Sequence, residues 1–129
     1  MNDSDNAIEC PVELAVQLIN KKWTIQILRD MFFGKTHFNE FKVDKPNLSN
    51  KVLSNCLKEM EENGLISRNS DENNQNIEYL LTWKGKQLNK VIYELAMFTL
   101  ETDLNNNYYD DATKEELRKI FSETLIDEK

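Results

Sequence analysis

Apolar residues recur along most of the chain at intervals of three and four, which is typical of amphipathic helices. Two short segments differ. Residues 65–69 and 77–81 are strand-like, and residues 71–76 between them hold no apolar side chain. This arrangement predicts an antiparallel hairpin with a polar tip. The helices are expected to begin near Pro11, Trp23, Phe38, Ser49, Thr82 and Thr113.

Turn and cap residues separate these helices. Gly34 and Gly64 suit the position just after a helix end. Residues 44–47, Asp-Lys-Pro-Asn, predict a turn, because proline fixes φ and asparagine tolerates the left-handed region. The expected N-caps are Ser49, Thr82 and Thr113.

The order of elements indicates the fold. A brief helix over residues 38–43, with Phe38 and Phe41 facing inward, is followed by a tight turn and a capped helix, as in a helix-turn-helix. The hairpin directly after it is then a wing. We expect a mainly α fold with a small β-hairpin: an acidic tail over residues 1–9, a winged helix-turn-helix domain with dimerisation helices over 10–104, and an acidic C-terminal helix over 105–129.

Composition limits the class of protein. Forty per cent hydrophobic and 30% charged residues fit a soluble globular chain of 129 residues. No window is apolar enough to cross a bilayer, and the acidic start MNDSDNAIE does not resemble a secretory signal, so a cytoplasmic protein is expected. Cys10, Cys56 and His37 lack the spacing of a disulfide scaffold or a zinc site, and no cofactor or metal is expected.

The formal net charge of -7 is unevenly distributed. Residues 1–13 carry four acids and no base, and residues 101–129 carry nine acids and four bases. Residues 14–100 carry twelve bases and ten acids, so the middle of the chain is slightly basic. Because the local field governs contact with a polyanion, the acidic total is only a weak argument against a nucleic-acid partner.

The helix that begins at Ser49 has the chemistry of a DNA-reading helix. With Leu53, Leu57 and Met60 buried, its remaining faces carry amides, hydroxyls and lysines near the N-terminus, and its acids come only in the last turns. Asparagine can pair with adenine, and lysine can donate to guanine or phosphate. An ordinary solvated face is the alternative. The predicted DNA-binding residues of this helix are Ser49, Asn50, Lys51, Ser54, Asn55 and Lys58.

The hairpin is expected to make fewer DNA contacts than this helix. Arg68 at its base is a further predicted DNA contact, but the tip carries Asp71 and Glu72 and no base, so it is a poor minor-groove reader. Lys84, Lys86 and Lys90 could touch phosphate, but an ordinary solvated face is at least as good an interpretation.

Several motifs together resemble the HxlR family of bacterial regulators, a branch near the MarR-type winged-helix proteins. The resemblance covers about residues 10–98. It rests on the opening Cys-Pro-Val-Glu, on Lys-Trp-Thr, on Phe-Asn-Glu-Phe, and on the Ser-x-Lys-x-Leu start of the reading helix, in this order. Each motif alone is weak, and their combination is specific.

The resemblance implies a homodimer that binds a palindromic operator in double-stranded DNA and regulates nearby genes. We expect it to act as a repressor. The resemblance also places residues around 14–19 and 88–98 at the dimer interface. Some members sense oxidants or electrophiles at the position of Cys10, and packing is the alternative role for that thiol. Cys56 is expected to lie in the core. The effector is unspecified.

The chain departs from the family pattern in two places. The wing tip lacks the usual prolines and basic residue, and Trp83 stands where an acid is usual. Trp83 is expected to pack against a neighbouring helix. An enzyme is the weaker rival function, since there is one histidine, expected to be structural, and no phosphate-binding glycine loop. A winged helix that binds protein instead of DNA is the stronger rival.

Overall fold

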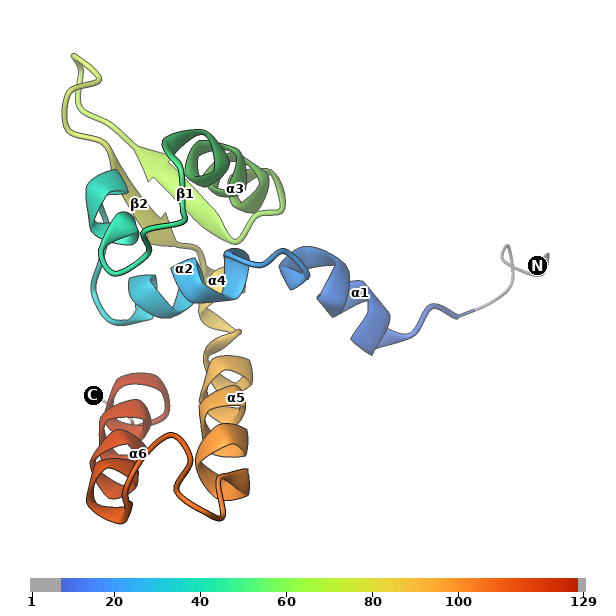
Figure 1. The fold of residues 1–129 in the computed structure, drawn as a ribbon. Helices are drawn as coiled ribbons and strands as arrows, with labels where there is room; N and C mark the ends of the chain where they lie inside the picture. The colour runs from blue at the N-terminus through green and yellow to red at the C-terminus, as the bar shows by residue number, and fades with distance from the viewer. Residues whose placement is uncertain (1–7, 128–129) are drawn as a thin grey trace.

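The computed structural model describes residues 8–127, and the first seven residues of the predicted acidic tail lie outside this range. Figure 1 shows a helical molecule with one hairpin. The elements are α1 (Pro11–Ile19), α2 (Thr24–Phe32), the 3₁₀ helix η2 (Phe38–Lys42), α3 (Asn50–Glu62), β1 (Ile66–Asn69), β2 (Glu78–Leu81), α4 (Trp83–Lys86), α5 (Asn89–Thr102) and α6 (Asp111–Leu125).

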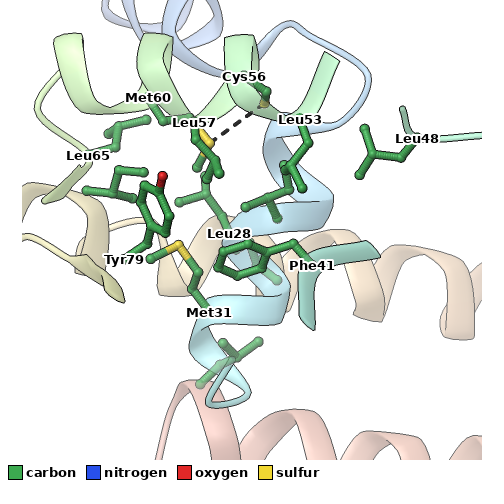
Figure 2. Packing of buried hydrophobic residues seen from close by; sticks show 14 residues of the cluster. Leu28, Met31, Phe41, Leu48, Leu53, Cys56, Leu57, Met60, Leu65 and Tyr79 are labelled. Atoms are coloured by element: carbon green, nitrogen blue, oxygen red, sulfur yellow. Dashed lines mark hydrogen bonds between the residues drawn. The ribbon is translucent and has the colours of Figure 1, made fainter. Parts of the chain in front are cut away.

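The core lies where α2, η2, α3 and the hairpin meet. Figure 2 shows Leu53 and Leu57 of α3 above Leu28 of α2 and Phe41 of η2. Phe41 is fully buried and its ring lies edge-on to Tyr79 of β2, with centroids 6.2 Å apart. This packing fixes the orientation of α3, because the apolar stripe of an amphipathic helix has one face to bury.

The hairpin is antiparallel, as predicted, with Ile66 opposite Leu81 and Asn69 opposite Glu78. Its strands each start one residue later than expected. The amide of Tyr79 also donates to the carbonyl of Thr36, at 2.8 Å, which attaches the segment before η2 to the outer edge of β2. The predicted winged helix-turn-helix arrangement is confirmed.

Both predicted glycine caps are present. Gly34 has φ +101° and Gly64 has φ +77°. After α3, the Leu65 amide donates to the Met60 carbonyl and the Gly64 amide to the Glu61 carbonyl, both at 3.0 Å. These two bonds form a Schellman motif, which satisfies the last carbonyls of the helix and turns the chain into β1.

Three local predictions were wrong. Thr82 is an N-cap, as predicted, but the single helix expected after it is interrupted at residues 87–88, so Thr82 caps the four-residue α4 and α5 begins at Asn89. Thr113 is not an N-cap; Asp110 is, and its carboxylate accepts the Thr113 amide at 2.8 Å. In the turn of residues 44–47 the left-handed residue is Asp44, with φ +62°, and not the asparagine.

The remaining helices surround this core, to which α5 contributes Ile92 and α6 contributes Leu125. Figure 1 shows α5 and α6 side by side and α1 projecting away from the body. No residue of α1 is fully buried, although Leu18 and Ile19 pack against the core. Within residues 8–127, no helix is both long and apolar enough to span a bilayer.

Candidate nucleic-acid interface

The helix predicted to read DNA is α3, and both of its ends are well defined. The Ser49 hydroxyl accepts the Val52 amide at 3.1 Å, which caps the first turn as the sequence predicts. Leu53, Leu57 and Met60 are buried, so the apolar stripe is also as predicted. A fixed first turn matters for this kind of site, because its free amides make the N-terminus of a helix the positive end of the dipole.

The opposite face of α3 is open to solvent. Residues turn by about 100° per step in an α-helix, so Lys51, Asn55 and Lys58 point away from the buried stripe. All three are exposed, as are Ser49, Asn50 and Ser54. The structure therefore leaves every predicted contact of this helix accessible.

Two of these side chains have neighbours that the sequence did not reveal. The Asn50 amide oxygen accepts a hydrogen bond from Lys42 of η2, so Asn50 lies on the flank of α3 toward the first half of the motif. Asn55 lines a hollow of about 200 Å³ beside Trp23 and Cys56. Helical spacing places a residue on a face but does not identify its neighbours from other elements.

The acids of α3 are kept away from its first two turns. Glu59 faces the corner between α1 and α2, where its carboxylate lies 3.8 Å from the ammonium of Lys21. Glu61 and Glu62 are exposed in the last turn. The half of α3 that would approach an anionic duplex thus carries Lys51 and Lys58 and no carboxylate.

The wing tip is rigidly built but acidic. The Asp71 carboxylate accepts the amides of Gln75, at 2.9 Å, and Asn73, at 3.1 Å. These bonds hold the pKa of Asp71 below its ordinary value, the bond from Gln75 contributing most, so the tip is negatively charged at neutral pH. Arg68, by contrast, is exposed at the base of the hairpin opposite Tyr79.

Other candidate residues take structural positions. The Lys84 ammonium donates to the carbonyl of Asn63 at the end of α3, at 3.1 Å, which joins α4 to the reading helix. The amide of His37 donates to Glu40 at 2.9 Å, at the start of η2. Trp83 was expected to pack against a helix and does not: 78% of its surface is exposed.

The two cysteines differ in accessibility. Cys10 is exposed at the residue just before α1, whereas Cys56 is buried with 9% of its surface exposed, as predicted. Burial raises the pKa of the Cys56 thiol, and the nearby Thr24 hydroxyl opposes that shift only in part. At neutral pH Cys56 is therefore a protonated, poorly nucleophilic thiol.

Comparisons with known proteins agree with this geometry. The model of the HxlR-like helix-turn-helix family matches residues 18–106. The uncharacterised HTH-type transcriptional regulator YvaP of Bacillus subtilis is 38% identical over 103 residues, which is 78% of this chain and 93% of YvaP.

Two solved structures of regulators are also similar. The redox regulator HypR in its oxidised form superposes with a TM-score of 0.63 at 30% identity, covering 69% of this chain and 93% of HypR. Quinone-bound YodB from B. subtilis superposes with a TM-score of 0.59 at 33% identity, covering 70% of this chain and 97% of YodB.

Proposed function

The chain belongs to the HxlR-like helix-turn-helix family of transcriptional regulators, and on this premise we propose that it binds a palindromic operator as a homodimer and represses the adjacent genes. The observation that carries this proposal is the stretch of α3 from Asn50 to Lys58, whose exposed face presents Lys51, Asn55 and Lys58 and no acid. A dimer bound over a promoter excludes polymerase, and this is the simplest route to repression.

In the proposed complex the N-terminal half of α3 lies in the major groove. Lys51 and Lys58 donate to phosphate or to guanine, and Asn55 pairs with adenine, a contact worth about 1–3 kcal/mol of discrimination. Asn50 reads a base after exchanging its bond to Lys42. The remaining contacts, from Ser49, Ser54 and Arg68, go to the backbone and fix the register of the helix on the duplex.

Dimerisation is supported by apolar side chains that the monomer leaves in water. On α5, Leu95 is 49% exposed and Phe98 is 66% exposed, and on the projecting α1, Leu14 and Val16 are also exposed. Soluble monomers rarely expose large apolar groups in such numbers. A twofold axis through these helices would place two copies of α3 on successive turns of one face of the duplex.

Footprinting tests the DNA-binding proposal. The probe is the DNA upstream of the protein's own gene or of its divergent neighbour. We expect two protected half-sites whose centres lie about one helical turn, roughly 10 base pairs, apart, and binding that weakens as salt rises. Absence of any protection at low salt with these fragments would contradict the proposal and favour a protein-binding winged helix.

We further propose that Cys10 makes operator binding responsive to oxidants or electrophiles. Its thiol is exposed at a helix N-terminus, whereas Cys56 is buried and protonated. Among the similar proteins, HypR is a redox regulator and YodB has been solved with a quinone bound. The proposed reaction is addition of the Cys10 thiolate to an electron-poor carbon of a quinone, or formation of a disulfide between the Cys10 thiols of the two protomers, whose two electrons and two protons reduce diamide to its hydrazine.

Mass spectrometry after diamide or benzoquinone tests this second proposal. We expect modification at Cys10 before Cys56, and a loss of operator binding that the Cys10→Ser protein does not show. Wild-type binding that ignores both reagents, or equal loss in the Cys10→Ser protein, would contradict it. The Cys56→Ser protein is the matched control and should respond like the wild type.

A further inference from the structure

A hollow of about 580 Å³ lies between α2, the turn after η2, and α6. One side of it is apolar: Phe33 at the end of α2, and Ile120 and Phe121 of α6. Phe33 and Phe121 meet edge to face, with ring centroids 5.3 Å apart, and Ile120 is 39% exposed. A volume of this size with a largely apolar wall is typical of a small-molecule pocket.

The other side of the hollow is charged and contains a buried ion pair. The ammonium of Lys45 donates to Asp30 Oδ2, and these side chains are only 4% and 6% exposed. Asp30 Oδ1 accepts two hydrogen bonds from Arg29, from Nε at 3.2 Å and from Nη2 at 2.9 Å. One carboxylate therefore pairs with two cations. This pairing stabilises the buried charges, because desolvated charges are stable only when they are paired.

The charges around the hollow do not balance. Arg29, Lys35 and Lys45 supply three positive charges, and Asp30 and Asp44 supply two negative charges. Within residues 8–127, Lys35 joins no ion pair. The α6 side chains that line the hollow are Leu117, Ile120 and Phe121, which add no charge. The hollow thus carries a net charge of about +1 next to an aromatic wall.

We propose that this hollow binds a small amphipathic monocarboxylate, with its apolar body against Phe33 and Ile120 and its carboxylate between Arg29 and Lys35. A singly charged anion fits because it would neutralise the excess charge, and guanidinium groups bind carboxylates through paired N–H donors. The family model ends at residue 106, before α6 begins at Asp111, so Ile120 and Phe121 of the apolar wall come from a helix outside the matched region.

The hollow beside Trp23 and Cys56 fits such a ligand less well. It measures about 200 Å³, and its charged residues, Lys21 and Glu59, lie 3.8 Å apart as an ion pair. The larger hollow therefore has the stronger chemical basis as a site for an anion.

The proposed site is connected to the reading helix through Lys45. The Lys45 carbonyl accepts the Leu48 amide at 3.1 Å, and Leu48 directly precedes Ser49, the cap of α3. A carboxylate that draws Arg29 or Lys45 away from Asp30 would therefore act on the turn that holds the first residues of α3. This coupling rests on the proposed DNA-binding function, whereas the ligand site itself does not.

Amide NMR with phenylacetate as the probe and phenylacetamide as its uncharged match tests the site in the full chain without DNA. We expect chemical-shift changes centred on the backbone amides of residues 33–35 and 117–121. Phenylacetate should bind about tenfold more tightly than phenylacetamide. Lys35→Gln should remove most of this preference, whereas Lys119→Gln, on α6 but outside the hollow, should not. Ile120→Asp should abolish phenylacetate binding, while its backbone amide NMR spectrum should still be that of the folded protein.

Three results would overturn the site: no localised shifts up to roughly 10 mM phenylacetate, equal binding of acid and amide, or shifts confined to the Trp23 hollow. The coupling is measured separately, as operator affinity with and without phenylacetate. An affinity that changes in wild type but not in Lys35→Gln supports it, and an unchanged affinity beside intact ligand binding overturns the coupling alone. Failure of all DNA binding would instead reject the proposed function and leave the NMR result standing.

Discussion

Residue-level packing explains why α4 contains a glycine. A Cβ built on Gly85 would lie 2.1 Å from the carbonyl oxygen of Leu65, a backbone atom that cannot move aside without disturbing the start of β1. The Thr82 amide also donates to that oxygen, at 3.1 Å. Glycine is therefore needed here for the close approach of two backbones and not for an unusual φ.

Replacing Gly85 with alanine should destabilise the protein by about 1–3 kcal/mol, because the new methyl group overpacks the contact with Leu65. In an ordinary helix the same change is favourable by roughly 0.5–1 kcal/mol, so the expected sign is reversed. Urea unfolding measures the difference, with Lys86→Ala as the exposed control in the same helix. A Gly85→Ala protein as stable as the wild type would show that the contact is not as tight as the structure has it.

The buried pair of Asp30 and Lys45 shows what residue patterns could not predict. Lysine and aspartate are almost never fully buried unless paired, and the two are fifteen positions apart with a turn between them. Nothing in the local spacing indicates that α2 and this turn meet. The contacts predicted correctly, such as the Ser49 cap, depend on residues three positions apart.

At the scale of elements, the link between α5 and α6 is organised by one carboxylate. Asp103 accepts the amides of Asn107 at 2.6 Å, Tyr108 at 3.0 Å and Tyr109 at 3.2 Å, and the Lys114 ammonium lies 3.9 Å away. Burial acts to raise the pKa of Asp103, but these bonds and Lys114 together hold it below its ordinary 3.8. The ionised form is therefore the one that stabilises the link.

This shift has a definite pH dependence. Because the folded pKa of Asp103 lies below the unfolded one, its stabilisation is complete above pH 3.8 and is lost as the pH falls through the folded pKa. Asp103→Asn should therefore lower the free energy of unfolding at pH 7, and the gap from wild type should narrow in acid. The exposed Glu101→Gln protein is the control. A gap that stays constant from pH 7 to pH 2 would contradict this role.

Elements with a strong apolar period were predictable, and their junctions were not. The spacing of Leu53, Leu57 and Met60 was enough to predict α3 and its buried face. The break between α4 and α5 at residues 87–88 has no glycine or proline to mark it, so the apolar spacing alone predicted one continuous helix. Likewise Asp110 rather than Thr113 caps α6, since both types are good caps and only the backbone path selects between them.

At the scale of the molecule, oligomerisation decides whether two copies of α3 can act together. Phe98→Glu should convert the proposed dimer to a monomer, because a carboxylate on the 66% exposed ring position would be buried unpaired at the interface. Sedimentation should then give the 15.2 kDa chain mass instead of twice that value. The far-UV spectrum should be unchanged, and Glu94→Gln should remain dimeric. A Phe98→Glu protein that is still dimeric would show that the dimer interface does not include Phe98.

The distribution of charge also acts at this scale. Many of the acids lie in the last turns of α3, at the wing tip and in the two terminal segments, whereas the first turns of α3 carry Lys51 and no acid. The sequence allowed this division of charge to be predicted because it requires only counting along the chain. The neighbours of Asn50 and Asn55 could not be predicted, since Lys42 and Trp23 come from other elements.

The salt dependence of operator binding by the wild type and by Lys51→Ala tests the central claim most directly. If α3 lies in the groove with Lys51 on a phosphate, Lys51→Ala should weaken binding to all sequences and reduce the slope of log K against log salt by about 1. Lys119→Ala, an exposed lysine on α6, should change neither. Equal slopes for the wild type and Lys51→Ala, with equal affinity at low salt, would contradict the placement of α3 on DNA.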